Sequence, residues 1–335
     1  MQNEILKNLY TLWRRTKIGG YYVSKRINHA LNSAQETQWY TILGYDPHIR
    51  VAFPDHNTVK RIQNVRPEEL AGQTPLLICH GFLNCGRSYA NYKNADRFKR
   101  PIFSFDYPEV ASLRNINLGE DHDTCALLYV LHEISKINPD KKLDILAHSR
   151  GAGTALRALY ATLHPEKHNE LFKSIGIHVD TQQGFEQVQS IKLMLAGRNI
   201  MLAYPMLNAH TAIKHVSDQL QYVVKPRGFI SQTSNSGNPR AWEDIINTQL
   251  QASTNFTGAD VQPIDLLQDI LKEHTFSLGF AFATKDDIVS NNHDAQVKKL
   301  IELYPVNQNA GAYLITDQGQ DHDDLAAVFN IVANK

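Results

Sequence analysis

Cysteine is scarce in this sequence, and its scarcity excludes a large class of small disulfide-bonded folds. The chain of 335 residues contains only three cysteines, Cys79, Cys85 and Cys125. A disulfide framework needs an even and larger set, and the spacing of these three matches no zinc-binding pattern. We therefore expect reduced thiols in a cytoplasmic protein. The alternative is export by a route that needs no N-terminal signal.

A surplus of charge of either sign is also lacking. The 34 basic side chains balance 34 acidic ones, and the sequence pI is about 7.3. A nucleic-acid binder would need a basic surplus to neutralise phosphates, so we expect no nucleic-acid partner. Hydrophobic residues make up 42% of the chain. That content is typical of a folded globular protein and too high for a disordered one.

Long hydrophobic runs are absent as well. No stretch approaches the 18 apolar residues that a transmembrane helix requires. Residues 1–50 are predicted to form a helical extension, because their apolar side chains recur at helical spacing and are interrupted by charges, unlike a secretory signal. We expect this helix to pack on the main domain. The alternative is a helix that binds a partner or the surface of a membrane, because four basic side chains cluster there: Lys7, Arg14, Arg15 and Lys17.

Motifs for nucleotides and metals are missing too. The sequence has neither a GxGxxG nor a GxxxxGK[ST] loop, so we expect no nucleotide cofactor. Two runs combine histidine with acidic residues, Asp121–Asp123 and Asp321–Asp324. Neither has the two-histidine-plus-carboxylate spacing of a zinc enzyme. We interpret them as solvated loops or helix caps and expect no metal.

What the sequence does contain is a regular alternation of short apolar runs with helical patterns. This alternation predicts βαβ units, hence an α/β fold with a mostly parallel central sheet and helices on both faces. The expected strands are Thr58–Val65, Pro75–Cys79, Ile102–Phe105, Leu143–Ala147, Phe172–Val179, Phe276–Ala283 and Ala312–Thr316. The expected helices include Asp121–Ser135, Gly151–Leu163 and Leu325–Val332.

The alternation breaks between Asp180 and Glu273, which predicts a helical cap, or lid, inserted into the domain. The expected organisation is an extension (1–50), a first part of the core (51–180), the cap (181–273) and a second part of the core (274–335). Within the cap, Ile191–Leu207 is rich in Leu and Met. We expect a helical surface that lines an apolar acyl pocket, or alternatively one that packs on the core.

One motif indicates chemistry, the run Ala147-His148-Ser149-Arg150-Gly151 between a predicted strand and a predicted helix. This context is typical of a nucleophile elbow, a sharp turn that exposes a serine hydroxyl above a sheet. The turn needs small residues two positions before and after the serine, and Ala147 and Gly151 meet that need. The helix that follows would place its positive N-terminal end beside the hydroxyl.

These features resemble the α/β-hydrolase superfamily, in particular its serine esterases and lipases. The resemblance covers roughly Thr58 to the C-terminus, and the order Ser, Asp, His along the chain fits the family pattern. It implies that Ser149 is the nucleophile, Asp286 the triad acid and His322 the triad base. The specificity comes from the conjunction of these features, because the serine motif alone is weak.

The resemblance also implies an oxyanion hole. In this sequence His80-Gly81-Phe82-Leu83 follows a predicted strand, so the backbone N–H groups of Phe82 and Arg150 would bind the oxyanion. The side chain of His80 is expected to orient that loop. We expect His148 to point into the structure and Cys85 to take no part in the chemistry.

Alternatives stay open for two roles. Asp287, the neighbour of Asp286, could serve as the triad acid, and so could Asp180, at the end of the predicted strand Phe172–Val179. The Arg150 side chain is expected to matter little beside its N–H, although it could hold an anionic group of a substrate.

The sequence thus predicts a serine hydrolase that cleaves a carboxylic ester or thioester through an acyl-enzyme. Its substrate would be a small-molecule or lipid-like compound with an apolar acyl group. A serine peptidase or an acyltransferase would present the same residues. A non-catalytic binding protein that keeps the scaffold is the alternative from another class, and the filled triad positions argue against it.

Overall fold

The computed structural model describes most of the central domain, namely residues 47–54, 58–81, 86–107, 122–205, 207, 263–283, 291–303, 312–317 and 325–333. Its strands are β1 (Arg50–Ala52), β2 (Val59–Arg61), β3 (Leu76–Cys79), β4 (Ile102–Ser104), β5 (Asp144–His148), β6 (Asn199–Ala203), β7 (Ser277–Ala283) and β8 (Ala312–Asp317). Its helices are α3 (Gly86–Tyr89), α4 (Tyr92–Phe98), α5 (His122–Ile137), α6 (Arg150–Leu163), α7 (Asn169–Ser174), α8 (Gln182–Leu195), α12 (Pro263–Glu273), α13 (Asn291–Leu303) and α14 (Ala326–Ala333). Three short 3-10 segments are η3 (Ile62–Asn64), η4 (Pro67–Glu69) and η5 (Pro165–His168).

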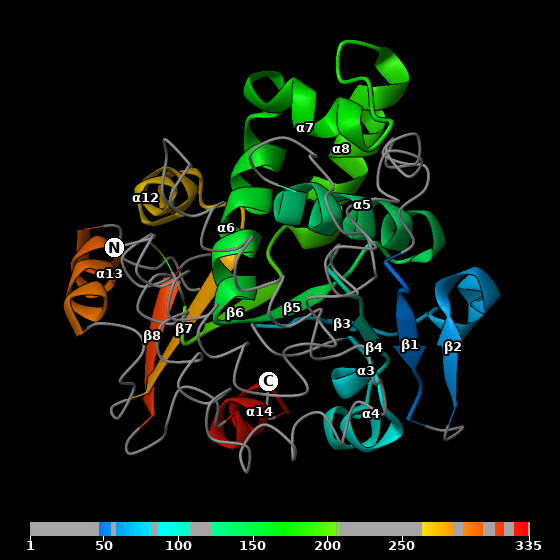
Figure 1. Cartoon of the computed structure of the whole chain (residues 1–335), viewed down its shortest axis with the longest axis horizontal. Coiled ribbons are helices and arrows are strands. Elements are labelled where there is room, and N and C mark those ends of the chain that lie inside the picture. The colour runs from blue at the N-terminus through cyan, green and yellow to red at the C-terminus, as the bar shows by residue number, and fades with distance from the viewer. Residues whose placement is uncertain are drawn as a thin grey trace, which may run out of the picture.

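The described strands form one eight-stranded sheet with the order β2-β1-β4-β3-β5-β6-β7-β8 (Figure 1). β1 is antiparallel to both β2 and β4, and the remaining neighbours are parallel. The parallel strands therefore end along one edge of the sheet, the edge at which α/β proteins place their ligands. The predicted α/β class with a mostly parallel sheet is confirmed.

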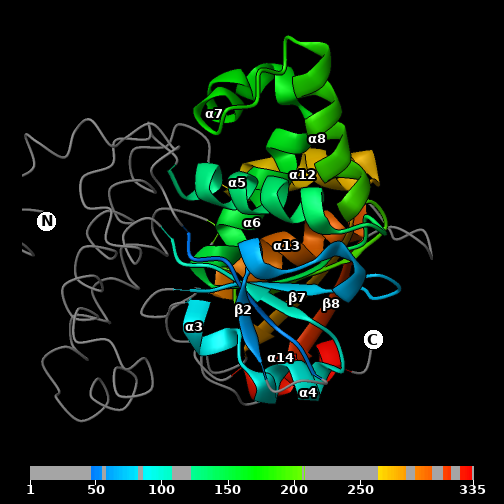
Figure 2. The same ribbon diagram turned by 90° about the vertical axis from the view of Figure 1, so that its right-hand side faces the viewer.

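Helices cover both faces of the sheet and create two cores (Figure 2). Leu77 and Cys79 of β3 face the larger core under α5, α6, α8 and α12, and Leu76 and Ile78 face the smaller one over α3, α4 and α14. All four are buried. A strand covered on both faces needs apolar side chains at every position, which is why β3 is a continuous apolar run. Among the described helices, none has the length and apolar character to cross a bilayer.

One predicted strand is wrong. Phe172–Val179 contains the end of helix α7 and a turn in which Gly176 has a φ of +78°. The sequence resembles a strand because it is a short run with several apolar side chains, which the structure buries. Phe172 and Ile177 nevertheless belong to the larger core, in which α7 packs on α5. The apolar pattern indicates burial correctly and secondary structure incorrectly.

The expected cap is wrong in the described residues 191–205, which include a strand of the central sheet. Ile191–Leu207 is not one helical surface, because it contains the end of α8, a turn at Gly197 and strand β6. β6 lies between β5 and β7 inside the sheet. Both α8 and α12 pack against α6. Residues 208–262 of the predicted cap lie outside the described residues, as do residues 1–46 of the predicted extension.

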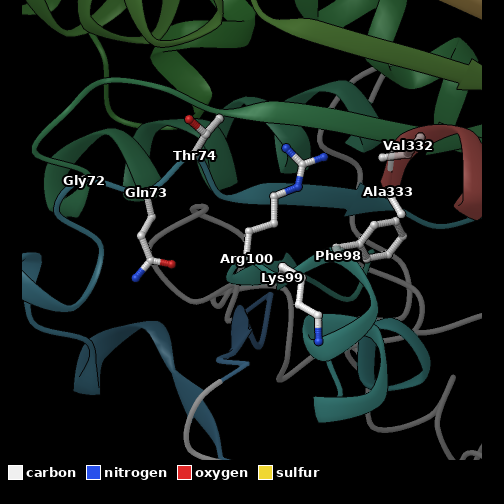
Figure 3. A pocket seen from close by; sticks show the side chains of 8 residues that line it. All are labelled: Gly72, Gln73, Thr74, Phe98, Lys99, Arg100, Val332 and Ala333. Atoms are coloured by element: carbon white, nitrogen blue, oxygen red, sulfur yellow. The ribbon is translucent and has the colours of Figure 1, made fainter. Parts of the chain in front are cut away.

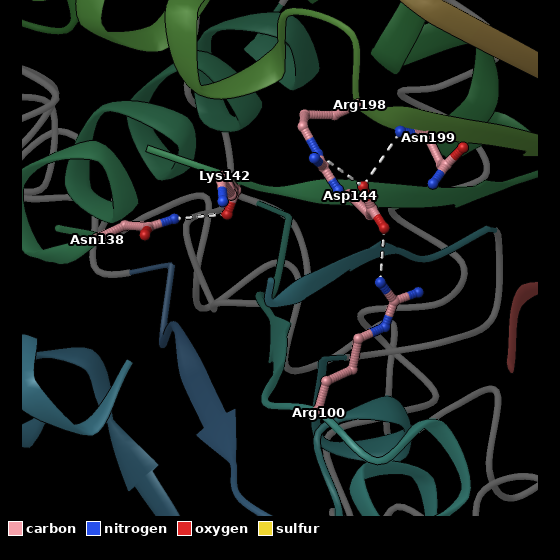
Figure 4. A network of polar contacts seen from close by, with 6 residues as sticks. All are labelled: Arg100, Asn138, Lys142, Asp144, Arg198 and Asn199. Carbon is pink, nitrogen blue, oxygen red and sulfur yellow. Dashed lines mark hydrogen bonds and ion pairs between the residues drawn. The ribbon is translucent and has the colours of Figure 1, made fainter. Parts of the chain in front are cut away.

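A buried carboxylate joins the strand ends at the edge opposite to Ser149 (Figure 4). Asp144 begins β5, and its Oδ2 accepts a hydrogen bond from Arg100 Nη1 at 2.6 Å. Its Oδ1 accepts bonds from Arg198 Nε at 3.2 Å and from the backbone N–H of Asn199 at 3.1 Å. Arg100 leads into β4 and Asn199 begins β6, so one side chain links the starts of three strands.

We expect Asp144→Asn to lower the free energy of unfolding by about 2 kcal/mol, because it removes the counter-charge of two partly buried arginines. Asp269→Asn is the matched control. It breaks an ion pair with Lys272 in which both side chains are about half exposed, so its cost should stay below about 0.5 kcal/mol. Urea unfolding followed by circular dichroism measures both. Equal costs for the two variants would contradict the structural role of Asp144.

A pocket of about 320 Å³ opens at the same edge as Asp144 (Figure 3). It is lined by Gly72, Gln73, Thr74, Phe98, Lys99, Arg100, Val332 and Ala333. Thr74 precedes β3 and Arg100 precedes β4, whereas Ser149 follows the far end of the parallel strand β5. The sheet therefore separates this pocket from the serine.

Candidate active site

Ser149 occupies a strained turn between β5 and α6. Its backbone has φ 54° and ψ −117°, a conformation that costs a residue other than glycine about 1–3 kcal/mol. Two hydrogen bonds hold the turn. The Ser149 N–H donates to the carbonyl of Ala203 at 2.8 Å, and its carbonyl accepts from the N–H of Ala152 at 3.0 Å. This is the strand–turn–helix geometry that the sequence motif predicts.

Gly151 shows why the turn needs a small residue after the serine. A Cβ atom at this position would lie 2.5 Å from the carbonyl oxygen of Cys79 and 2.8 Å from that of His80. Both contacts are with backbone, which cannot move aside as a side chain can. The start of α6 thus lies directly against the end of β3.

The loop after β3 lies against the serine. A Cβ atom on Gly81 would be 3.0 Å from the Ser149 Cβ and 2.8 Å from His148 Nδ1. His80 Nδ1 lies 2.8 Å from the Gly81 carbonyl oxygen, and burial lowers the pKa of His80 to about 4. The ring is therefore neutral at pH 7 and donates from Nδ1, since a carbonyl oxygen can only accept. These contacts agree with the loop-orienting role predicted for His80.

The Arg150 side chain points away from any substrate. It is fully buried, and its Nε and Nη2 donate to the two carboxylate oxygens of Asp123 at 2.6 and 2.5 Å. Its guanidinium also lies over the ring of Tyr107, 4.9 Å from the centroid. The alternative in which Arg150 holds an anionic substrate group is therefore wrong. His148 is buried and its ring meets that of Tyr204 edge-on, so it points inward as predicted.

Comparisons with known proteins bear on the architecture. No protein-family model and no curated protein matches the sequence. Among solved structures, a candidate lipase from Acinetobacter baumannii AYE has a TM-score of 0.50 and 13% identity, over 79% of this chain and 82% of that chain. This chain has the α/β-hydrolase fold.

Two further solved structures are similar at lower TM-scores. A carboxylesterase from Lactobacillus plantarum WCFS1 has a TM-score of 0.44 and 12% identity, over 85% of this chain and 82% of that chain. A thioesterase domain from the curacin biosynthetic pathway has a TM-score of 0.47 and 14% identity, over 78% of this chain and 91% of that chain. Identities of 12 and 14% give no information about substrate.

Two of the predicted site residues follow strands of the sheet in the sequence. β7 ends at Ala283 and β8 at Asp317, both parallel to β5 and at the same edge of the sheet as Ser149. Asp286 and His322 follow these strand ends in sequence. Asp286, its alternative Asp287, His322, Phe82 and Cys85 all lie outside the described residues, so their roles stay predictions.

Asp180 does not fit the role of triad acid. The sequence suggests it only because a strand is expected to end there, and no strand does. The chain leaves Ser149 along α6, whose 14 residues extend about 20 Å. It reaches the exposed Asp180 only after α7 and just before α8. Figure 1 shows α7 at the end of α6 that is farther from the sheet.

The sequence prediction missed three residues near the serine. Tyr204 follows β6 with a φ of 49°, and its N–H donates to the Ala281 carbonyl at 2.8 Å. Asp123 and Tyr107 contact the Arg150 side chain. Tyr204 lies in the apolar run Ile191–Leu207, and hydrophobicity alone does not mark the strand end that it follows. No local pattern indicates the contacts of Asp123 and Tyr107, because they arise only from the packing of α5 and the β4 loop on α6.

The described residues include neither a reactive thiol nor a metal site. Cys79 and Cys125 are buried thiols, and the Cys125 sulfur accepts a hydrogen bond from Ser174 Oγ at 3.2 Å. Burial raises the pKa of Cys79 far above its usual value. A neutral, buried thiol is a poor nucleophile. Within the part of the chain that the structure describes, no three His, Cys, Asp or Glu side chains gather in a way that could hold a metal ion.

Proposed function

We propose that this protein is a serine hydrolase that cleaves a carboxylic ester or thioester through Ser149, His322 and Asp286. The observation that carries the proposal is the strained backbone of Ser149 at the β5–α6 junction. Strain of this size persists only where the surrounding contacts enforce it, and such strain concentrates at functional sites. An ordinary turn serine would not need it.

The proposed reaction follows from the roles of these groups. His322 takes the proton from Ser149 Oγ, which attacks the acyl carbon, while Asp286 fixes the tautomer of the imidazole. Collapse of the tetrahedral intermediate breaks the ester bond, and His322 returns the proton to the leaving alcohol or thiol. Water then attacks the acyl-enzyme in the same way, which releases the acid and restores Ser149.

The backbone geometry supports Arg150 as one donor to the oxyanion. Its N–H belongs to the same peptide group as the Ser149 carbonyl, which accepts the bond from Ala152 along α6. A planar trans peptide directs its N–H opposite to its carbonyl. The Arg150 N–H therefore points out of the N-terminal end of α6, where helical N–H groups have no intrahelical partner. Phe82 is proposed as the second donor.

The substrate class is proposed as a small-molecule or lipid-like acyl compound. The apolar run Ile191–Leu207 does not support this class as its sequence suggested, because Met194, Leu195 and Leu202 belong to the core. The part of the predicted cap at residues 208–262 lies outside the described residues and stays a prediction. Contact of the N-terminal extension with a membrane surface is also a proposal, because residues 1–46 lie outside the described residues.

A fluorophosphonate probe with a reporter group tests the function. We expect the wild type to be labelled and Ser149→Ala to lose labelling entirely, with hydrolysis of a short activated ester reduced by at least about 10⁴-fold. Circular dichroism should show that both proteins are folded. Thr154→Ser, on the buried face of α6, is the control and should be labelled at the wild-type rate. A folded wild type that stays unlabelled would favour the non-catalytic alternative.

A panel of chromogenic esters and thioesters of increasing acyl length then separates the remaining enzyme classes. Turnover that depends on acyl length supports an esterase or thioesterase. Labelling with no turnover on any ester would instead indicate a peptidase or an acyltransferase. Substitutions in the triad cannot make this distinction, because one triad serves several substrate classes.

A further inference from the structure

The buried side chain of Arg150 makes contacts that substrate chemistry does not explain. Its guanidinium binds the Asp123 carboxylate through two parallel hydrogen bonds at 2.6 and 2.5 Å. The Arg150 side chain has no exposed area and that of Asp123 has 7%. A two-bond pair of this kind fixes orientation as well as distance.

The loop after β4 also contacts the Arg150 guanidinium. The ring of Tyr107, in the loop after β4, lies 4.9 Å from the guanidinium carbon, a favourable cation–π distance. Asp123 belongs to the first turn of α5, where the positive end of the helix stabilises its negative charge. One side chain of α6 is thereby tied to α5 and to the β4 loop.

The same ring reaches the other side of the serine. Tyr107 meets the ring of His80 edge-on at 4.7 Å between centroids, and His80 is hydrogen-bonded to the Gly81 carbonyl. Gly81 in turn lies against Ser149. The two segments that flank the serine, the start of α6 and the loop after β3, therefore share Tyr107 as a common support.

We propose that Asp123, acting through the Arg150 side chain, is a positioning residue that holds the Arg150 N–H in place for the oxyanion. The inference rests on the proposed function. Any rotation of the first turn of α6 would swing this N–H relative to Ser149 Oγ. The Asp123 carboxylate and the Tyr107 ring oppose such a rotation from two directions.

Stability alone does not account for the pair. Replacing a buried ion pair by well-packed apolar side chains is often neutral or stabilising, because two charges no longer have to be desolvated. The planar fork of arginine offers directionality that an apolar side chain lacks. Arg150 directly follows the proposed nucleophile. The direction of its N–H therefore affects how well the oxyanion is bound.

The test compares Asp123→Asn and Arg150→Lys with the wild type, at a temperature where circular dichroism shows each to be folded. The readouts are the second-order rate constant for fluorophosphonate labelling and the kcat and KM for an activated ester. We expect Asp123→Asn to label about 10- to 100-fold more slowly. This is less than the roughly 10²–10³-fold cost of losing an oxyanion donor, because the Arg150 N–H is displaced and not removed. The kcat of Asp123→Asn should fall by the same factor as its labelling rate, with little change in KM. Arg150→Lys keeps the positive charge but cannot form two parallel hydrogen bonds with Asp123. It should label at a rate between those of the wild type and Asp123→Asn.

Asp144→Asn is the matched control, because it also breaks a buried carboxylate–arginine contact but at the opposite edge of the sheet. It should lose stability and label at the wild-type rate.

Folded Asp123→Asn labelling at the wild-type rate overturns the inference and leaves the proposed function standing. So does an equal slowing in Asp144→Asn. If Asp123→Asn does not fold, Arg150→Lys decides: slowed labelling supports the inference and the wild-type rate overturns it. An unlabelled wild type overturns the proposed function, and the inference with it.

Discussion

A Ser149→Gly variant is expected to melt at a higher temperature than the wild type while losing the proposed nucleophile. The φ of 54° and ψ of −117° at this position cost a side-chain-bearing residue about 1–3 kcal/mol, and glycine adopts them freely. Glycine loses about 0.5–1 kcal/mol more conformational entropy on folding. The net gain is about 1 kcal/mol, which should raise Tm by about 2 °C in a chain of this size.

Ser149→Ala separates the two effects of that change. Alanine keeps the Cβ atom, and therefore the backbone strain, but lacks the hydroxyl. Both variants should lose ester hydrolysis by at least about 10⁴-fold, whereas only Ser149→Gly should gain stability. Calorimetry of the three proteins under one condition measures the difference. An alanine variant as stable as the glycine variant would show that no strain is stored in the turn.

Gly151→Ala is expected to cost about 3 kcal/mol or more of stability, at the upper end of the range for overpacking. The new methyl group would meet the carbonyl oxygens of Cys79 and His80 at 2.5 and 2.8 Å. To relieve these contacts, either β3 or the first turn of α6 must move, and both adjoin Ser149. Activity per folded molecule should therefore fall together with stability.

Gly72→Ala is the control for this experiment. Gly72 has a φ of +73°, but a methyl group added there would have no atom within 4 Å, so it tests the backbone penalty without a collision. Its cost should be about 1–2 kcal/mol, with activity unchanged. Urea unfolding and ester hydrolysis measure both variants. A Gly151→Ala protein with wild-type stability would mean that α6 and β3 approach each other less closely than these distances require.

The sequence was most informative where structure depends on neighbours along the chain. The elbow could be predicted because its strand, small residues and helix all lie within a short stretch around Ser149. β3 could be predicted because a strand buried on both faces must be apolar throughout. The centre of β5, Ile145–Ala147, could be predicted for the same reason. Each of these features is visible without knowing what packs against it.

Prediction failed where one apolar run serves two elements. In Ile191–Leu207 the buried side of α8 continues, after the turn at Gly197, into strand β6, which is buried from Ile200 to Ala203. Hydrophobicity alone could not divide the run. The partners of Arg150 could not be predicted for a different reason, because Asp123 and Tyr107 come from distant segments. Asp286, His322 and Phe82 follow from their order along the chain and stay predictions.

The hydrogen bond from Ser149 to Ala203 also has a consequence for biosynthesis. The elbow is bounded by β3, which is translated before it, and by β6, which is translated after it. Contacts between such distant segments form only after the intervening loops close. A nascent chain whose β6 is still inside the ribosome therefore carries Ser149 as an ordinary, unstrained serine. The strained turn that holds the proposed nucleophile would thus form only when β6 has joined the centre of the sheet.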